Sequence, residues 1–131
     1  MTLKGAHVIR LPVLALFASL LIAPVTAAQD AAHGRQVFNA CTSCHTVTSE
    51  RHTFGPSLKG VVGRGIGTAP DYRYSDVMHQ AGADGKIWDE ATLSTFLANP
   101  SKVMPGTKMR FWGLWTDAEI KDVIAYLAAH P

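Results

Sequence analysis

The segment Cys41-Thr42-Ser43-Cys44-His45 constrains the fold of this chain more than any other feature. Two cysteines separated by two residues, with a histidine directly after the second, form the attachment pattern of a c-type haem. The two-residue spacing lets one helical turn present both thiols to the two vinyl groups on one edge of a porphyrin. His45 then lies under the metal and can offer an imidazole nitrogen to iron. The motif predicts that the chain folds around one covalently bound haem c.

Three other interpretations of the two cysteines compete with haem attachment. A thiol–disulfide redox pair requires a βαβ context, which the hydrophobic pattern does not supply. Half of a zinc site requires a second cysteine pair or a histidine pair, and this chain has only two cysteines. A structural disulfide is the third interpretation, and it is common in exported proteins. The histidine directly after the second cysteine favours haem over all three.

The N-terminal segment 1–28 has the composition of a secretory signal peptide. Basic residues precede an almost wholly apolar run at 11–23, and small residues follow it. We expect cleavage after Ala27 or Ala28, which leaves one domain at 29–131 in the periplasm. An uncleaved membrane anchor is the alternative, but the run is short of the ~20 apolar residues that span a bilayer.

The charge balance and the length of the predicted domain restrict the functions and the kind of core that it can have. The whole chain has 12 Lys and Arg against 10 Asp and Glu, and two of the basic residues, Lys4 and Arg10, lie in the predicted signal peptide. Ten basic and ten acidic residues therefore remain in the domain. The sequence has no run of basic residues and no interleaving of basic with aromatic residues, so it gives no support to nucleic-acid binding. A domain of this size has a thin core, so we expect the haem to form much of the core and the apoprotein to be poorly folded.

Capping residues and apolar periodicity predict about four helices. Asp30 can cap a helix from about Ala31 into Cys41, and a short helix is expected at 75–80. Asp89 can cap a third helix, which Asn99-Pro100 would end. Thr116 and Glu119 form a capping box for the last helix, whose apolar positions follow the i, i+3, i+4, i+7 rule: Ile120, Val123, Ile124 and Leu127.

The segment 46–74 is a long loop rich in glycine and proline. Loops of this length in a small domain indicate a function or a ligand around which the chain wraps. No alternation typical of strands is sustained along the chain. The prediction is therefore a small all-α fold, with long loops wrapped around one haem.

The second axial ligand of the iron decides the chemistry. A methionine gives a six-coordinate haem for electron transfer, whereas an open position allows ligand binding or peroxidase reactions. Met109 is the strongest candidate because a turn-rich segment between two predicted helices can lay its thioether over the haem. Met78 falls on a predicted helix, and any single methionine can be core filler. Spacing alone leaves other candidates open: Met78, Met104, His33, His52, His79 and His130.

From Gly34 to His130 the chain resembles class I cytochrome c, of the mitochondrial and bacterial cytochrome c2 type. The matching segments occur in the family's order around the haem motif and cover nearly the whole predicted domain. They are Gly34 with Phe38, Phe54 to Arg64, Asn99-Pro100, Pro105 to Met109, and Asp122 to Leu127. The resemblance implies that Gly34, Phe38, Val123 and Tyr126 form a crossing of the first and last helices.

The resemblance also implies roles for residues around the haem. Met109 would be the axial ligand opposite His45, and the Pro56 carbonyl would accept the His45 ring N–H, which fixes the imidazole. Three further residues match positions that hold the haem propionates: Arg64, Tyr74 and Trp88. An arginine offsets carboxylate charge, and both aromatics add a donor to an apolar body; ordinary core aromatics are the alternative.

The function that the resemblance implies is electron carriage by a soluble periplasmic protein, not enzyme catalysis. Redox partner proteins, such as membrane or periplasmic reductases and oxidases, would exchange one electron with a monomer that is not stably inserted in the membrane. The alternative is a haem peroxidase or small-ligand-binding cytochrome with a labile or open distal site.

Charged residues near the expected haem edge give two interpretations. A basic rim could steer an acidic partner through the association rate, or the same residues could be scattered solvated charge. The candidates are Lys59, Lys102, Lys108 and Arg110. Ala40 and Ser101 occupy places where relatives often have lysine, which weakens the rim.

Overall fold

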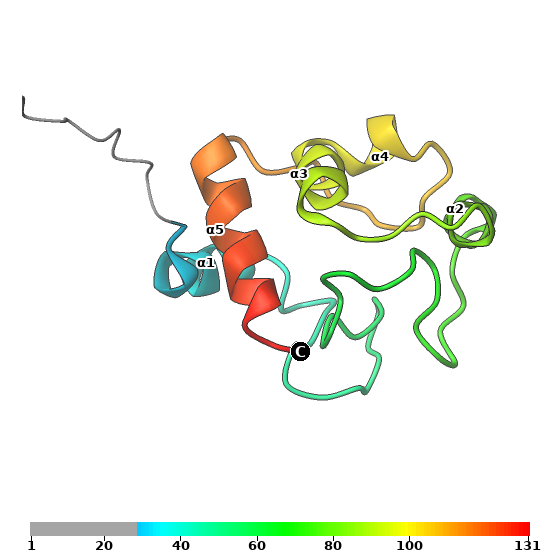
Figure 1. Cartoon of the computed structure of the whole chain (residues 1–131), viewed down its shortest axis with the longest axis horizontal. Helices are drawn as coiled ribbons and strands as arrows, with labels where there is room; N and C mark the ends of the chain where they lie inside the picture. The colour runs from blue at the N-terminus through cyan, green and yellow to red at the C-terminus, as the bar shows by residue number, and fades with distance from the viewer. Residues whose placement is uncertain (1–28) are drawn as a thin grey trace, which may run out of the picture.

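Five helices joined by long loops make up residues 29–131, the part of the chain that the computed structural model describes (Figure 1). They are α1 (Ala31–Phe38), α2 (Asp76–Ala83), α3 (Glu90–Ala98), α4 (Pro100–Val103) and α5 (Asp117–Ala128). Within 29–131 there is no strand, only an isolated bridge between Gly65 and Ile87. The predicted all-α fold is confirmed. The predicted signal peptide and its cleavage site lie outside the described residues.

Three helices begin at the capping residues that the sequence indicates. At the start of α3, the Asp89 side chain accepts a hydrogen bond from the Thr92 N–H at 2.7 Å. The Asp30 side chain accepts hydrogen bonds from the N–H groups of Ala32 and His33 at the start of α1. At the start of α5, Thr116 Oγ1 accepts from the Glu119 N–H, and the Glu119 carboxylate accepts from the Thr116 N–H. All three caps satisfy N–H groups that have no partner within their helix.

Two helix boundaries and one additional helix differ from the sequence-based prediction. Helix α1 ends at Phe38, and the chain continues to the motif through turns rather than as helix to Cys41. Helix α2 extends to Ala83, beyond the predicted end at residue 80. The sequence does not predict the short α4, because Asn99-Pro100 indicates only the end of the preceding helix. Proline also suits the first position of a helix, and the Asn99 side chain caps α4 through the Lys102 N–H.

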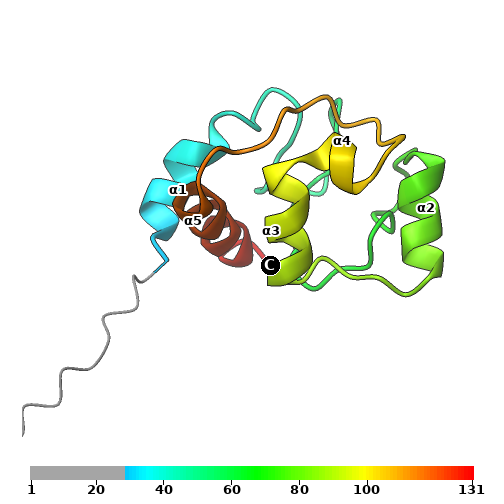
Figure 2. The ribbon, with the colours of Figure 1, turned by 90° about the horizontal axis from the view of Figure 1, so that it is seen from above.

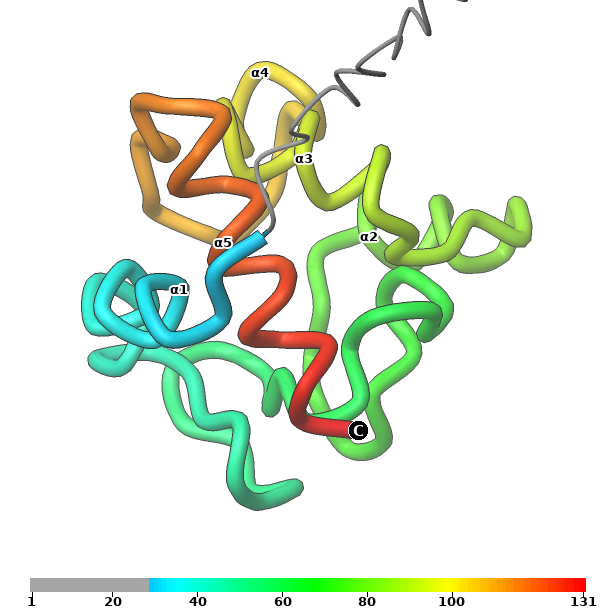
Figure 3. The backbone as a smooth tube through the Cα atoms, turned by 60° about the vertical axis from the view of Figure 1, so that its left-hand side comes forward, coloured from blue at the N-terminus to red at the C-terminus, as the bar shows by residue number. Residues whose placement is uncertain are grey.

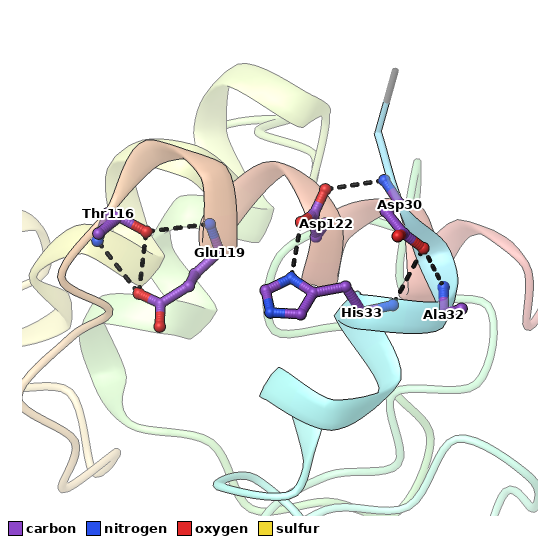
Figure 4. A network of polar contacts seen from close by, with 6 residues as sticks. All are labelled: Asp30, Ala32, His33, Thr116, Glu119 and Asp122. Atoms are coloured by element: carbon purple, nitrogen blue, oxygen red, sulfur yellow. Dashed lines mark hydrogen bonds and ion pairs between the residues drawn. The ribbon is translucent and has the colours of Figure 1, made fainter. Parts of the chain in front are cut away.

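Helices α1 and α5 cross in close contact, as the resemblance implies (Figures 1 and 2). A side chain at Gly34 would overlap the backbone carbonyl of Asp122, so only glycine allows this approach. The rings of Phe38 and Tyr126 pack beside it, with centroids 5.3 Å apart. Polar contacts close the outer side of the crossing (Figure 4): Asp122 accepts from the Asp30 N–H and contacts His33 Nδ1, both at 2.8 Å.

The remaining elements surround the interior from several sides. Helix α3 lies between the α1–α5 pair and α2 in Figure 2. The loop region that follows the motif runs near the C-terminal end of α5 (Figure 3), where the Gly60 N–H donates to the His130 carbonyl at 2.7 Å. None of the helices within 29–131 has the length and apolar character needed to cross a membrane.

Candidate functional site

A cavity of about 510 Å³ occupies the interior between the helices and the long loops. Its wall combines the segment 38–45, the loop 54–64, the segment 72–78, parts of α3 and α5, and the segment 107–114. The volume falls in the range of ligand sites in proteins. A smaller hollow of about 290 Å³ lies at the C-terminal end of the chain and includes no residue of the cysteine motif in its wall.

The cysteine motif forms a tight turn on the cavity wall. The N–H groups of Cys44 and His45 both donate to the Cys41 carbonyl, at 3.0 and 2.9 Å. Cys41 and Cys44 are half-buried, form no disulfide and both line the cavity. Burial, with a smaller effect of Cys44, raises the pKa of the Cys41 thiol to about 11. One turn thus presents two thiols and an imidazole to the same space.

His45 is held as a neutral imidazole by its surroundings. Its Nδ1 lies 2.7 Å from the Pro56 carbonyl oxygen, which can only accept, so Nδ1 carries the proton. Burial lowers the pKa of His45, and the hydrogen bond to Pro56 opposes this effect only partly. The neutral ring with a proton on Nδ1 has its lone pair on Nε2. This is the form in which histidine binds a metal.

Gly55 contributes to the position of His45, although the sequence analysis did not select it as a site residue. A Cβ atom at Gly55 would overlap the ring of His45, nearest to Cε1 and 2.7 Å from Nδ1. Glycine therefore allows the backbone before Pro56 to pass close over the imidazole. The signal in the sequence was the Gly-Pro dipeptide in the loop, but the contact with His45 appears only in the fold.

Arg64 and Ser75, two residues of the cavity wall, each have a buried polar atom without a hydrogen-bond partner. Arg64 donates through Nη1 to the Lys59 carbonyl and through Nη2 to the Ser57 carbonyl, both at 3.0 Å. Its Nε and the Ser75 Oγ are buried without a hydrogen-bond partner, and both residues line the cavity. Buried polar groups are rarely unpaired in folded proteins. The two groups therefore fit the carboxylates of a bound molecule, and Ser75 is a further residue that the sequence analysis missed.

Tyr74 and Trp88 lie at the cavity, together with Arg64. Tyr74 is half-buried and packs edge-on against Tyr72, with centroids 4.8 Å apart. Burial raises the pKa of its hydroxyl, which stays protonated and able to donate at neutral pH. Trp88 is buried and packs against Phe96 at 4.9 Å. The fold thus gathers all three residues that the resemblance assigns to the propionates.

Two of the alternative axial ligands lie at the cavity. Met109 and Met78 both line it, whereas Met104 is buried elsewhere in the core. The four other candidates do not line it: His33, His52, His79 and His130. Three of these histidines contact other residues instead. His33 contacts the Asp122 carboxylate, His52 the Pro70 carbonyl and His130 the Tyr126 carbonyl.

The segment that contains Met109 is tethered to the facing loop. Lys108 Nζ donates to the carbonyls of Arg73 and Tyr74, both at 3.1 Å. The Met109 N–H approaches Thr107 Oγ1 at 3.3 Å, and the buried Thr107 also lines the cavity. Met78, by contrast, lies on α2 within the apolar core. Within 29–131, no group of three His, Cys, Asp or Glu side chains could hold a metal ion, so the zinc interpretation gains no support.

Comparison with known proteins shows the family to which the chain belongs. The family model for cytochrome c matches residues 31–131. The chain belongs to the cytochrome c family. Cytochrome c2 of Rhodomicrobium vannielii is 46% identical over 103 residues, which cover 78% of this chain and 80% of that protein. Cytochrome c2 of Agrobacterium tumefaciens is 39% identical over 99 residues, 75% of this chain and 89% of the other.

Solved structures of cytochromes match the fold over most of the described chain. Ferricytochrome c2 from Rhodopseudomonas palustris superposes with a TM-score of 0.72 at 34% identity, over 78% of this chain and 99% of that one. Cytochrome cH from Methylobacterium extorquens gives 0.70 at 42% identity, over 76% and 98%. This cytochrome c is therefore of the class I, bacterial cytochrome c2 type.

The cofactor follows from the family and from the residues present. The cytochrome c family and the Cys41–Cys44 pair give this chain one covalently bound haem c. The cavity fits such a group, because it combines two thiols, a neutral imidazole, a largely apolar wall and the unpaired Arg64 Nε. The chain is an electron-carrier cytochrome c, and it exchanges electrons with redox partners.

Proposed function

We propose that this cytochrome c carries single electrons as a soluble, monomeric periplasmic protein, and that it is not an enzyme. Residues 1–28 would be a signal peptide that is removed, and residues 29–131 the mature domain. When bound, the haem supplies a one-electron couple between ferric and ferrous iron. The protein's part is to hold both axial positions filled, exclude water and leave one edge close to partners.

The observation that carries the proposal is the meeting of two distant segments at one cavity. The motif turn at 41–45 supplies the thioether positions and His45 Nε2, and the tethered segment 107–109 supplies the Met109 sulfur. A histidine–methionine pair raises the potential of a c-type haem and leaves no open coordination position. Arg64, Tyr74 and Trp88 would hold the propionates, with Arg64 Nε as the charged donor.

The alternative function, a peroxidase or small-ligand-binding cytochrome, requires an open distal position. The tethering of Lys108 to two backbone carbonyls opposes it, because release of Met109 would have to move a segment fixed at both Arg73 and Tyr74. Met78 at the same cavity is the competing sulfur, so the ligand must be tested by substitution.

Absorption spectra of the purified holoprotein test the proposal. We expect the oxidised wild type to show the sulfur-to-iron charge-transfer band, and the ferrous form to bind carbon monoxide poorly. Met109→Ala should lose the band, bind carbon monoxide and have a lower reduction potential. Met78→Leu, the matched control, should keep all three properties of the wild type. If the band survived in Met109→Ala and disappeared in Met78→Leu, the axial ligand would be Met78 rather than Met109. Rapid carbon monoxide binding by the wild type would favour the open-site function.

Location and processing are tested separately from the haem ligands. The proposal expects the protein in the periplasmic fraction, with an N-terminus at Ala28 or Gln29. Mass spectrometry of the intact protein measures the cleavage site and the mass of the attached haem together. A mature mass that includes residues 1–28 would support the membrane-anchor alternative instead.

A further inference from the structure

We propose that Trp112 and Trp115 form an apolar docking surface through which a redox partner protein reaches the haem cavity. The inference rests on the electron-carrier function proposed above and concerns how the partner is recognised. It differs from a basic rim, because the contact energy would come from two indole rings rather than from charge.

Both tryptophans are almost fully exposed. Trp112 is 94% and Trp115 93% accessible to solvent, whereas Trp88, the remaining tryptophan, is buried in the cavity wall. Side chains so exposed add almost nothing to the packing of the described domain. The two residues lie three positions apart in one exposed stretch of chain. Exposed large apolar side chains that lie close together mark interaction sites, and tryptophan is enriched among the residues that dominate binding energy at interfaces.

The two tryptophans belong to a segment that forms part of the cavity wall. Along the segment 111–115, Phe111 and Leu114 are half-buried and line the cavity, and an exposed tryptophan follows each of them. Each tryptophan is therefore bonded directly to a residue of the cavity wall. A protein seated on the two rings therefore approaches the cofactor at the cavity wall, which electron transfer requires.

The backbone that displays the tryptophans is fixed in place. The Leu114 N–H donates to the Leu97 carbonyl at 2.8 Å. Gly113 has a φ of 109°, and a Cβ there would overlap the carbonyl oxygen of Ala98. The middle of the segment is thus fastened to the C-terminal end of α3, where it passes from α4 to α5 (Figure 1). A surface held in its binding conformation loses little entropy on docking.

The charges around the site do not support recognition by long-range steering. Residues 29–131 contain ten basic and ten acidic side chains. Among the rim candidates, Lys59 lies 3.6 Å from Glu50, and Lys108 donates to two backbone carbonyls. With no net charge and half of the rim engaged within the protein, electrostatic acceleration of encounter is small.

The charges next to the tryptophans indicate the chemistry of the partner. Exposed Arg110 lies just before Trp112 in the chain, and exposed Asp117 lies just after Trp115. The complementary surface is an apolar patch with an acidic group opposite Arg110 and a basic group opposite Asp117. A membrane with anionic lipids would require a cluster of basic residues, which this mixed pair does not provide. A protein is therefore the occupant that the charges favour.

The expected interface between this protein and its partner buries a small area. A buried tryptophan contributes about 150–250 Å² of surface. Two rings and their surroundings therefore form an interface at the lower end of the size range, where transient redox encounters lie. Such a complex dissociates readily, as a carrier that serves two partners in turn requires.

The experiment compares the oxidation of reduced holoprotein by two oxidants. Inner-membrane vesicles from the cells that produce the protein provide the docking partner, and hexacyanoferrate(III) provides a small oxidant without a docking face. The variants are Trp112→Ser with Trp115→Ser, and Ile87→Ser as a matched control. Ile87 is 46% exposed and does not line the cavity.

We expect the double variant to raise the apparent KM for oxidation by vesicles about tenfold or more, as the loss of dominant interface side chains does. Its reaction with hexacyanoferrate, its absorption spectrum and its potential should match the wild type. Ile87→Ser should match the wild type in every assay. The wild-type rate with vesicles should change little between about 20 and 500 mM NaCl, because screening acts on charge.

Other results would overturn the docking surface. If the vesicles oxidised the wild type and the double variant at equal rates, the docking surface would be refuted. A normal reaction of both proteins with hexacyanoferrate would still leave the proposed electron carriage intact. Failure of the wild type to react even with hexacyanoferrate would refute the proposed function itself. Tryptophan-dependent binding to protein-free vesicles of phosphatidylcholine and phosphatidylglycerol would assign the surface to lipid. Tryptophan-dependent dimers in sedimentation experiments would assign it to a second copy.

Discussion

The tautomer, charge and position of His45 are each determined by its immediate surroundings. Pro56 sets the tautomer through its carbonyl, and burial keeps the ring neutral. Gly55 allows both, because only a residue without Cβ lets this backbone pass so close to the imidazole. A general rule for haem motifs predicted the histidine and the resemblance implied the proline, but neither indicated that the glycine is in contact with the ring.

Gly55→Ala is therefore expected to displace His45 or the loop before Pro56. Overpacking of a filled site costs about 1–3 kcal/mol of the free energy of unfolding, and the holoprotein should also show altered absorption in the ferric state. Guanidinium denaturation and absorption spectra measure the two effects. Val62→Ala, a truncation at an exposed position of the same loop that does not line the cavity, is the control and should change both little. Wild-type stability and spectrum in Gly55→Ala would contradict the packing argument.

At the scale of elements, the α1–α5 crossing joins the two ends of the domain. The polar network of Figure 4 and the contact at Gly34 hold together residues about 90 positions apart in the sequence. A contact between segments so distant limits the freedom of the whole chain between them, which contains the cysteine motif, Met109 and the three propionate candidates.

Gly34→Val should weaken this crossing. The new side chain meets the backbone carbonyl of Asp122, which cannot move aside without displacing α5. We expect a loss of about 1–3 kcal/mol in the free energy of unfolding, measured by chemical denaturation. Ala32→Val, at an exposed position of the same helix, controls for the lower helix propensity of valine and should cost much less. Equal losses in the two variants would refute a role for close approach.

Asp122 should make the stability of the crossing depend on pH. The hydrogen bond from the Asp30 N–H, and then that from His33, lower the pKa of the Asp122 carboxyl. A group with a lowered pKa in the folded state stabilises the fold above its unfolded pKa of about 3.9, and the contribution is lost as the pH falls through the folded value. We therefore expect the stability difference between wild type and Asp122→Asn to shrink as the pH is lowered from neutral toward 3.

Denaturation curves at several pH values measure that difference. Asp117→Asn, an exposed carboxylate in the first turn of the same helix, is the matched control and should show a smaller change with pH. A difference between wild type and Asp122→Asn that stays constant across the range would show that the ionised carboxylate does not contribute through its lowered pKa.

For the whole molecule, the cofactor replaces a central core of side chains. The cavity is lined by residues from four of the five helices and from the long loops, so its walls have few partners other than the haem. Apolar surfaces that face an empty space lose the dispersion contacts of a packed interior. The thin core of a domain of this size then depends on the bound group for much of its buried surface.

The haem-free protein should therefore lack a cooperative, native-like thermal transition. Substitution of both attachment cysteines, Cys41→Ala with Cys44→Ala, prevents covalent attachment and gives the apoprotein. Circular dichroism measures its helix content and melting, with the holoprotein as control. A sharp melt with the helix content of the holoprotein would show that residues 29–131 fold without the cofactor.

The sequence by itself determined the cofactor, the fold class and the starts of α1, α3 and α5. These depend on local chemistry: the spacing of two thiols and a histidine, the capping oxygens of Asp30 and Thr116, and the apolar period of α5. Local patterns could not give α4, because Asn99-Pro100 is compatible with both the end of one helix and the start of the next.

Only the tertiary structure decided which distant residues share the cavity. It brought Met78 and Met109 to the same space and kept Met104 and four histidines away from its wall. It also left Arg64 Nε and Ser75 Oγ without partners, and it left two tryptophans in solvent beside the cavity wall. Burial, unpaired polar groups and close backbone approach are properties of surfaces that meet in space. The order of residues along the chain does not contain them, because the same loop sequence can point either inward or outward until the fold is complete.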